Sequence, residues 1–73
     1  MSVAAGDLVK NPDKASGLGR SVLLFDMGMG GSKLDNLAKA IELLMARGYR
    51  PVGFSAFQAA GGMTQGFCLL IRD

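Results

Sequence analysis

Residues 21–48 read SVLLFDMGMGGSKLDNLAKAIELLMARG, and the rest of the chain can be interpreted outward from this segment. The apolar run at residues 22–25 is short and has glycine on both sides, which is typical of a β-strand. A glycine-rich loop follows at residues 28–31. From residue 34 onward, apolar side chains recur at the spacing of one helix face. The segment therefore predicts a strand, a loop and an amphipathic helix in succession.

The helix is expected over about residues 33–47. Ser32 is a suitable N-cap, and Asp35 stands three residues later, at the position of a capping-box acid. Gly48 is the expected left-handed residue that ends the helix. The residues predicted to form its buried stripe are Leu34, Leu37, Ala38, Ile41, Leu44 and Met45.

Two further strands are expected after the helix, at residues 49–57 and 63–72, joined by a hairpin at residues 59–62. The helical crossover makes the first two strands parallel, and the long apolar third strand is placed in the centre. Gly66 in that strand marks a bulge or a close backbone approach. The predicted fold is an α/β (α+β) domain over residues 20–73, in the order β-α-β-β, with a three-stranded sheet and one helix on one face. Residues 1–19 are dense in turn residues and are expected to form an irregular arm.

Residues 37–72 combine a leucine-rich helix, a glycine-aromatic-x-x-valine segment, a glycine-rich hairpin, and a final apolar strand that ends in a basic residue. The residues of this pattern are Leu43, Leu44, Gly48, Tyr49, Val52, Gly61, Gly62, Thr64, Phe67 and Arg72. The pattern resembles a family of small uncharacterised bacterial β-α-β-β domains, from which the chain departs at Tyr49, where tryptophan is commoner, and at Pro51. The resemblance implies a fold and no established activity, so no catalytic residues are carried over.

The glycine loop is a candidate anion site. The backbone N–H groups of Gly30, Gly31, Ser32 and Lys33 would point out of the helix start, where the helix dipole favours a phosphate. The glycine spacing matches neither the Walker motif nor the dinucleotide fingerprint. The alternative interpretation is a corner of the fold that carries a serine cap.

Catalysis is not expected. The chain has no histidine, which removes the commonest general base. Asp26 ends a strand beside the glycine loop. An acid at such a position either caps or solvates the strand end or serves as a catalytic or metal-binding group. Cys68 lies between apolar neighbours that raise a thiol pKa and make the group inert. We therefore predict no enzyme activity, no cofactor and no metal site.

Nucleic-acid binding is possible but not favoured. The net charge is +2, from 8 basic and 6 acidic residues, and the basic residues are scattered. A module that stacks bases on the sheet and contacts phosphates at its edges would use Phe54, Phe57, Phe67, Arg50, Arg72 and Lys39. Phenylalanines at alternating strand positions are, on the other interpretation, core residues.

An open sheet face is the predicted interaction surface, because one helix can cover only one side of the sheet. The residues assigned to this open face are Val22, Leu24, Phe57, Cys68 and Leu70. With 73 residues and one cysteine, the chain has a small core and no internal disulfide, so association is the expected means of stabilisation. The predicted function is that of a non-catalytic accessory protein that self-associates, as a homo-oligomer, or binds a protein partner.

The expected location is the cytoplasm. The apolar runs are too short to span a bilayer. Residues 1–7 show no basic start followed by an apolar stretch, so we expect no secretory signal. A lone thiol agrees with a reducing compartment.

Overall fold

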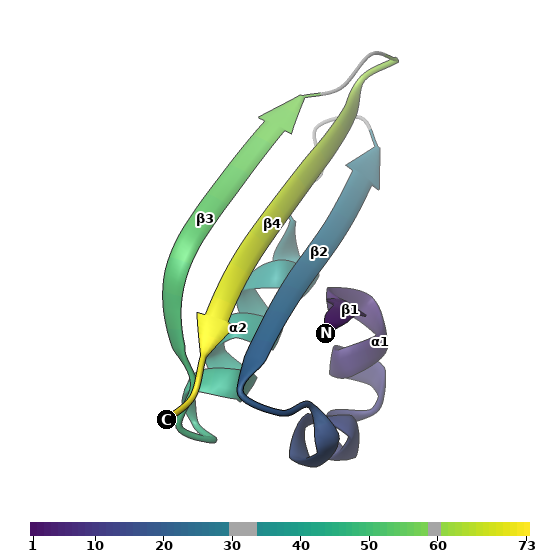
Figure 1. Cartoon of the computed structure of the whole chain (residues 1–73). Helices are drawn as coiled ribbons and strands as arrows, with labels where there is room; N and C mark the ends of the chain where they lie inside the picture. Colours follow the sequence, from purple (N-terminus) through teal and green to yellow (C-terminus); the bar gives the residue numbers. More distant parts are fainter. Residues whose placement is uncertain (30–33, 59–60) are drawn as a thin grey trace.

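The computed structural model of the chain describes residues 1–29, 34–58 and 61–73. The elements along these residues are β1 (Ser2–Ala4), α1 (Ala5–Lys10), the 3-10 helix η1 (Pro12–Gly17), β2 (Ser21–Met29), α2 (Asp35–Met45), β3 (Arg50–Gln58) and β4 (Met63–Ile71). Figure 1 shows the three long strands side by side in front of α2. The molecule is a small α+β domain with a mixed sheet.

The sheet has the strand order β1-β2-β4-β3. β4 runs antiparallel to β2 along its whole length, from Met63 opposite Met29 to Ile71 opposite Ser21. It also runs antiparallel to β3 on its other side. The prediction that the last strand lies in the centre is therefore confirmed. β2 and β3 are parallel to one another, as predicted, because both run against β4.

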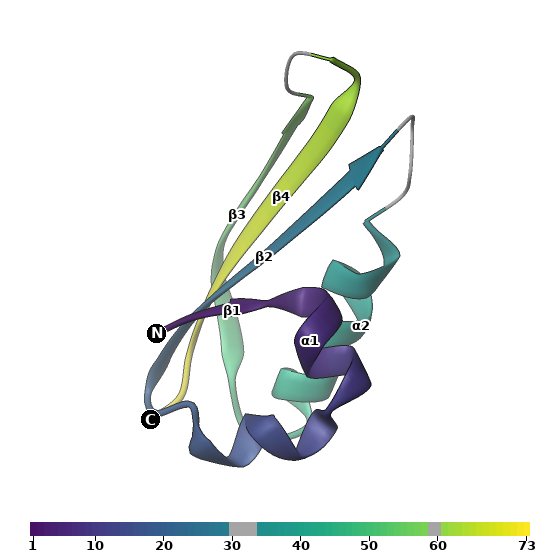
Figure 2. The same ribbon diagram turned by 90° about the vertical axis from the view of Figure 1, so that its right-hand side faces the viewer.

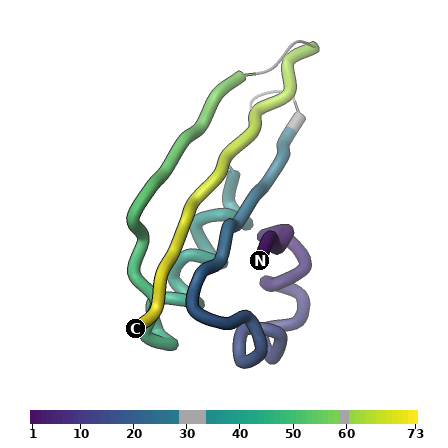
Figure 3. Tube along the Cα trace, viewed as in Figure 1, coloured from purple at the N-terminus to yellow at the C-terminus, as the bar shows by residue number. Residues whose placement is uncertain are grey.

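The N-terminal region is ordered, so the prediction of an irregular arm is wrong. β1 adds a fourth strand to the sheet by pairing in parallel with β2, and α1 packs against α2. Four residues before β2 belong to the main core, namely Ala5, Leu8, Ala15 and Leu18. Figure 3 shows this purple N-terminal part of the chain beside β2. The elements here have three to six residues, which is too short for a hydrophobic period to be recognised.

The helices cover one face of the sheet and leave the other bare, as the side view in Figure 2 shows. On the covered side, the buried strand residues are Val22, Leu24, Cys68 and Leu70. From α2 and the segment after it, the buried residues are Leu37, Ala40, Leu44 and Tyr49. The core therefore lies in a single layer between the sheet and the helices.

α2 begins at Asp35, two residues after the expected start at about residue 33. Its N-cap residue is Leu34, which has φ 50°. The proposed cap, Ser32, lies outside the described residues. The buried stripe is also rotated from the predicted one, because α1 packs on one flank of α2. Ala40 is buried, whereas Ala38 and Met45 are exposed.

α2 ends at Met45, two residues before the expected end at about residue 47, but the predicted left-handed glycine follows it. Gly48 has φ +93°, the left-handed conformation that side chains disfavour. Its N–H donates to the carbonyl of Met45, and the N–H of Tyr49 donates to the carbonyl of Leu44, each at 3.1 Å. These two bonds are those of a Schellman motif. The motif turns the chain sharply and buries Tyr49, whose hydroxyl donates to the carbonyl of Gly19.

Candidate functional site

The bare side of the sheet, which we call the outer face, carries many apolar side chains, with the polar residues Ser55 and Gln65 among them. Its apolar members in the described strands are Leu23, Phe25, Met27, Phe57, Phe67, Leu69 and Ile71. Alternation along each strand places them on the side away from the helices. Cross-strand pairing brings Leu23 opposite Leu69 and Phe25 opposite Phe67. Neighbouring strands thus contribute apolar side chains in register.

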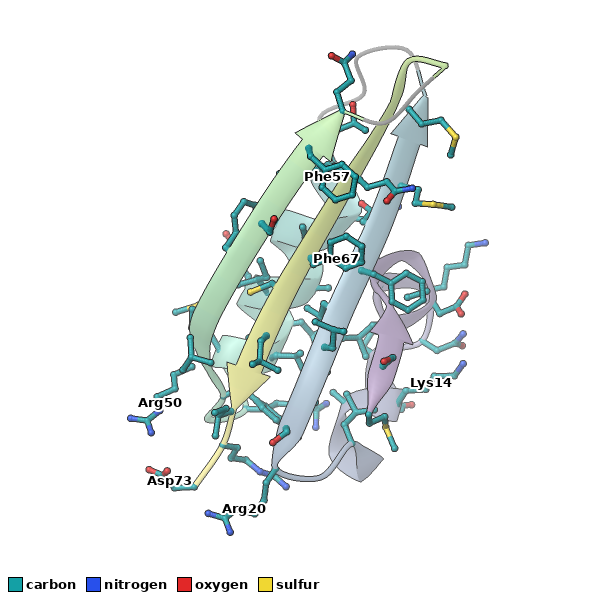
Figure 4. All side chains as sticks on the ribbon, turned by 45° about the horizontal axis from the view of Figure 1, so that its top comes forward. Lys14, Arg20, Arg50, Phe57, Phe67 and Asp73 are labelled. Carbon is teal, nitrogen blue, oxygen red and sulfur yellow. The ribbon has the colours of Figure 1, made fainter. Side chains whose placement is uncertain are left out.

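The outer face is exposed. Met27 is 58 % exposed, Phe57 is 48 % exposed and Leu69 is 39 % exposed. The rings of Phe57 and Phe67 stack with their centroids 6.0 Å apart, and Figure 4 shows the two rings together over β3 and β4. An aromatic pair of this kind covers only part of its own apolar area. The remaining area is open to contact.

The sequence prediction placed the open face on the wrong side of the sheet. Val22, Leu24 and Leu70 are 0 % exposed, and Cys68 is 1 % exposed, because the helices cover them. Of the five residues assigned to the open face, Phe57 is exposed on the outer face. The residues that the prediction missed there are Leu23, Phe25, Met27, Phe67, Leu69 and Ile71.

A signal for the correct side was present at Gly66. A Cβ atom added there would lie 2.7 Å from Leu34 Cδ1 and 2.8 Å from Leu37 Cδ2. Gly66 is thus the site of a close approach between the sheet and α2, one of its two predicted meanings. It shares its face with Cys68 and with Leu70, two and four residues further along the strand. A glycine at a helix contact would have shown which side the helix covers.

The candidate anion loop, Gly30, Gly31, Ser32 and Lys33, lies outside the described residues. The described start of α2 already holds an anionic group. Asp26 Oδ2 accepts the N–H of Leu37 at 3.1 Å, and Asp26 Oδ1 accepts the N–H of Met27 at 2.9 Å. The Asp26 carboxylate, which lies within β2, therefore caps the start of α2, whereas the structural role considered for it from the sequence was at the strand end.

The aromatic and basic residues of the nucleic-acid interpretation are divided between different parts of the molecule. Phe54 lies on the helix side of β3, opposite Cys68, whereas Phe57 and Phe67 lie on the outer face. The guanidinium of Arg72 is 5.0 Å from the centre of the Tyr49 ring, and Arg50 lies 3.6 Å from the carboxylate of Asp73. Figure 4 places Arg20 and Arg50 at the end of the sheet away from Phe57.

The two side chains considered for catalysis, Asp26 and Cys68, have structural roles. Burial raises the pKa of the Cys68 thiol, which keeps it protonated and unreactive. A hollow of about 230 Å³ beside β1 is lined in part by Asp7 and Asp26, the second of which already caps α2. In the described part of the chain, no three metal-binding side chains form a group that could hold an ion.

Comparison of the chain with protein-family models, curated proteins and solved structures finds no significant match. Among the described helices, none is long and apolar enough to cross a membrane. The surfaces of the molecule are therefore the basis on which a function is proposed.

Proposed function

We propose that this chain is a non-catalytic interaction protein that binds another protein molecule, either a second copy or a different partner, through the outer face. The observation that carries the proposal is the group of exposed and half-buried apolar side chains on the outer face of β2 and β4, which Phe57 extends onto β3. Monomeric proteins rarely leave an apolar patch of this extent uncovered.

The composition of the outer face supports protein binding. Phenylalanine and methionine are enriched at interface cores, and charged residues are depleted there. Along the described strands, the one charged side chain on this face is Arg50, which lies at its rim beside Asp73. Full burial of one large apolar side chain contributes roughly 1.5–3 kcal/mol, so completing the burial of several half-exposed ones offsets part of the entropy cost of association.

Two features support a non-catalytic role. The carboxylate of Asp26 is engaged by two backbone N–H groups, and Cys68 is buried with a raised thiol pKa. Neither side chain offers a free nucleophile or base to a substrate. The Asp26 carboxylate at the start of α2 also disfavours a phosphate at the same helix end, because two anions repel each other.

The test uses a charge placed in the centre of the outer face. Leu69→Lys changes a partly exposed outer-face residue, and Met45→Lys is the matched control on the exposed flank of α2. A photoreactive phenylalanine analogue in place of Phe25, introduced into the protein in its host cells, is expected to cross-link to one discrete protein. Leu69→Lys should abolish this cross-link and Met45→Lys should leave it intact.

The result that contradicts the proposal is equally specific. If position 25 yields no cross-link, or yields one that Leu69→Lys leaves unchanged, the outer face is not a protein-binding surface. Thermal unfolding of both variants is the control for folding, since neither substituted side chain belongs to the buried core.

A further inference from the structure

β3 is a long edge of the sheet, in which a proline and a ladder irregularity lie near the start of the strand and residues 54–58 carry no such protection against pairing. It pairs with β4 on one side, and no described strand pairs with its other side, as Figure 1 shows. All nine of its residues are exposed, and at about 3.4 Å per residue the edge is about 30 Å long. Natural edge strands are usually short or carry charges that prevent pairing. β3 has its single charge, Arg50, at its first position.

The helix side of β3 is also uncovered. α2 sits close over Gly66 of β4 and leaves a hollow of about 210 Å³ beside β3. The lining residues are Leu34, Leu37, Ala38, Ile41 and Phe54. Phe54 is 64 % exposed, although it points to the same side of the sheet as the core. An additional strand beside β3 would cover Phe54 and close this hollow.

We infer that β3 pairs antiparallel with β3 of a second copy, about a two-fold axis through Ser55. The two four-stranded sheets then form one eight-stranded sheet. Residues directly opposite each other share a face in such a pair, so both α2 helices lie on the same side. The two outer faces become one surface of twice the area.

The sequence of β3 is complementary to itself in this register. Gly53 lies opposite Phe57 of the other copy, and Phe54 lies opposite its Ala56. Each large ring therefore packs against a small residue, and Ser55 lies opposite Ser55. Cross-strand pairing of an aromatic ring with glycine stabilises a sheet edge. β3 thus contains both the large side chains and the small residues that lie opposite them. A second copy of β3 therefore completes the pairing, which is why we assign the second copy as the occupant.

Charge and backbone geometry agree with this register. Residues 51–58 carry no charge, so two copies meet without repulsion, and antiparallel pairing keeps the two Arg50 side chains apart. The irregularity of the β3–β4 ladder lies between Pro51 and Gly53. It is therefore outside residues 53–57, the five positions that make the complementary contacts.

The first experiment measures the mass of the full chain by light scattering after size exclusion, over a dilution series. Wild type is expected to have twice the mass of one chain at micromolar concentration. Phe54→Lys should raise the dimer dissociation constant by about tenfold or more, because the pairing buries an unpaired ammonium group. Met45→Lys and Leu69→Lys should leave it unchanged, since neither residue lies on the β3 edge.

A second experiment tests the register. Ser55→Cys places two thiols opposite each other at the two-fold axis, within reach of a disulfide, so mild oxidation should yield a covalent dimer. Gln58→Cys is the matched control, because residue 58 lies opposite residue 52 and not itself. Cys68 is buried and stays reduced in both variants. Cross-linking of Gln58→Cys as fast as Ser55→Cys would overturn this register.

Two other outcomes overturn the inference and leave the proposed function standing. One is a wild-type monomer across the whole dilution series together with partner cross-linking at position 25. The other is a dimer that Leu69→Lys dissociates and Phe54→Lys does not, which would assign self-association to the outer face. Conversely, an edge dimer without any cross-link at position 25, which lies on β2 and away from the β3 edge, supports the inference and contradicts the proposed function.

Discussion

Replacing Gly66 with alanine tests how closely α2 packs on the sheet. The added methyl carbon would lie 2.7 Å from Leu34 Cδ1 and 2.8 Å from Leu37 Cδ2. Non-bonded carbon atoms prefer about 3.5–4.0 Å, so each leucine must withdraw by about 1 Å. Leu34 is half-buried and can rotate outward, but Leu37 is 2 % exposed and is held by the core. Leu37 must therefore change its rotamer within the packed core, or α2 must shift away from the sheet.

The magnitude follows from two opposing effects. Overpacking a core contact costs about 1–3 kcal/mol of unfolding free energy. Removing a glycine from the interior of a strand returns roughly 0.5–1 kcal/mol. We expect Gly66→Ala to destabilise the fold by about 1 kcal/mol net, and in a domain of this size that lowers the Tm by about 4–8 °C.

Gly53→Ala is the matched control. Its added Cβ would lie 4.0 Å from Leu69 Cβ, an ordinary contact, so the substitution should be neutral or stabilise by up to about 1 kcal/mol. Urea unfolding followed by circular dichroism, at one low protein concentration, compares the two variants without a difference in association. If Gly66→Ala is as stable as Gly53→Ala, the leucines accommodate the methyl group and the close packing inferred for α2 is refuted.

The Asp26 carboxylate and the Cys68 thiol give further predictions. Asp26→Ala should lower the unfolding free energy, measured in urea titrations, by about 1 kcal/mol. Asp26→Asn should lower it by less, because the amide oxygen can still accept the N–H of Leu37. Equal stability of the two variants and the wild type would contradict the capping role of Asp26. The Cys68 thiol should react with a disulfide reagent far more slowly in the folded protein than in urea, and a rate typical of an exposed thiol would contradict its burial. Because burial raises the pKa of this thiol above 9.0, the unfolded chain ionises first, so stability should decline as the pH rises above about 9.0, and Cys68→Ala should remove that decline.

The helix and its end could be predicted from local sequence. The spacing of Leu37 and Leu44 and the glycine at position 48 act within a few residues of the chain, and α2 indeed spans Asp35–Met45 and ends in a left-handed glycine. The two long strands of the β3–β4 hairpin were likewise recognisable as alternating or continuous apolar runs between turn residues. The helix start was less predictable, because a side chain eleven residues before Leu37, that of Asp26, provides its described cap.

The N-terminal elements depend on contacts distant in sequence. β1 and α1 are too short to be stable or recognisable alone, and they form because β1 hydrogen-bonds to β2 and Leu8 is buried in the main core. The pattern of residues 1–19, rich in turn residues, carries no trace of these partners. The density of turn residues therefore indicated an irregular arm, whereas tertiary contacts give these residues regular structure.

Alternation along β2 and β4 is enough to define two apolar faces: Leu23, Phe67 and Leu69 on one, Val22, Cys68 and Leu70 on the other. This alternation does not determine which face the helices cover. The two faces are nearly equally hydrophobic, and the alternation of side chains along a strand does not indicate on which side a helix packs. That choice is made where α2 meets the strands, and Gly66 permits the approach on one side only. Local patterns thus specify the elements and their faces, whereas long-range packing selects the face that remains open to a partner.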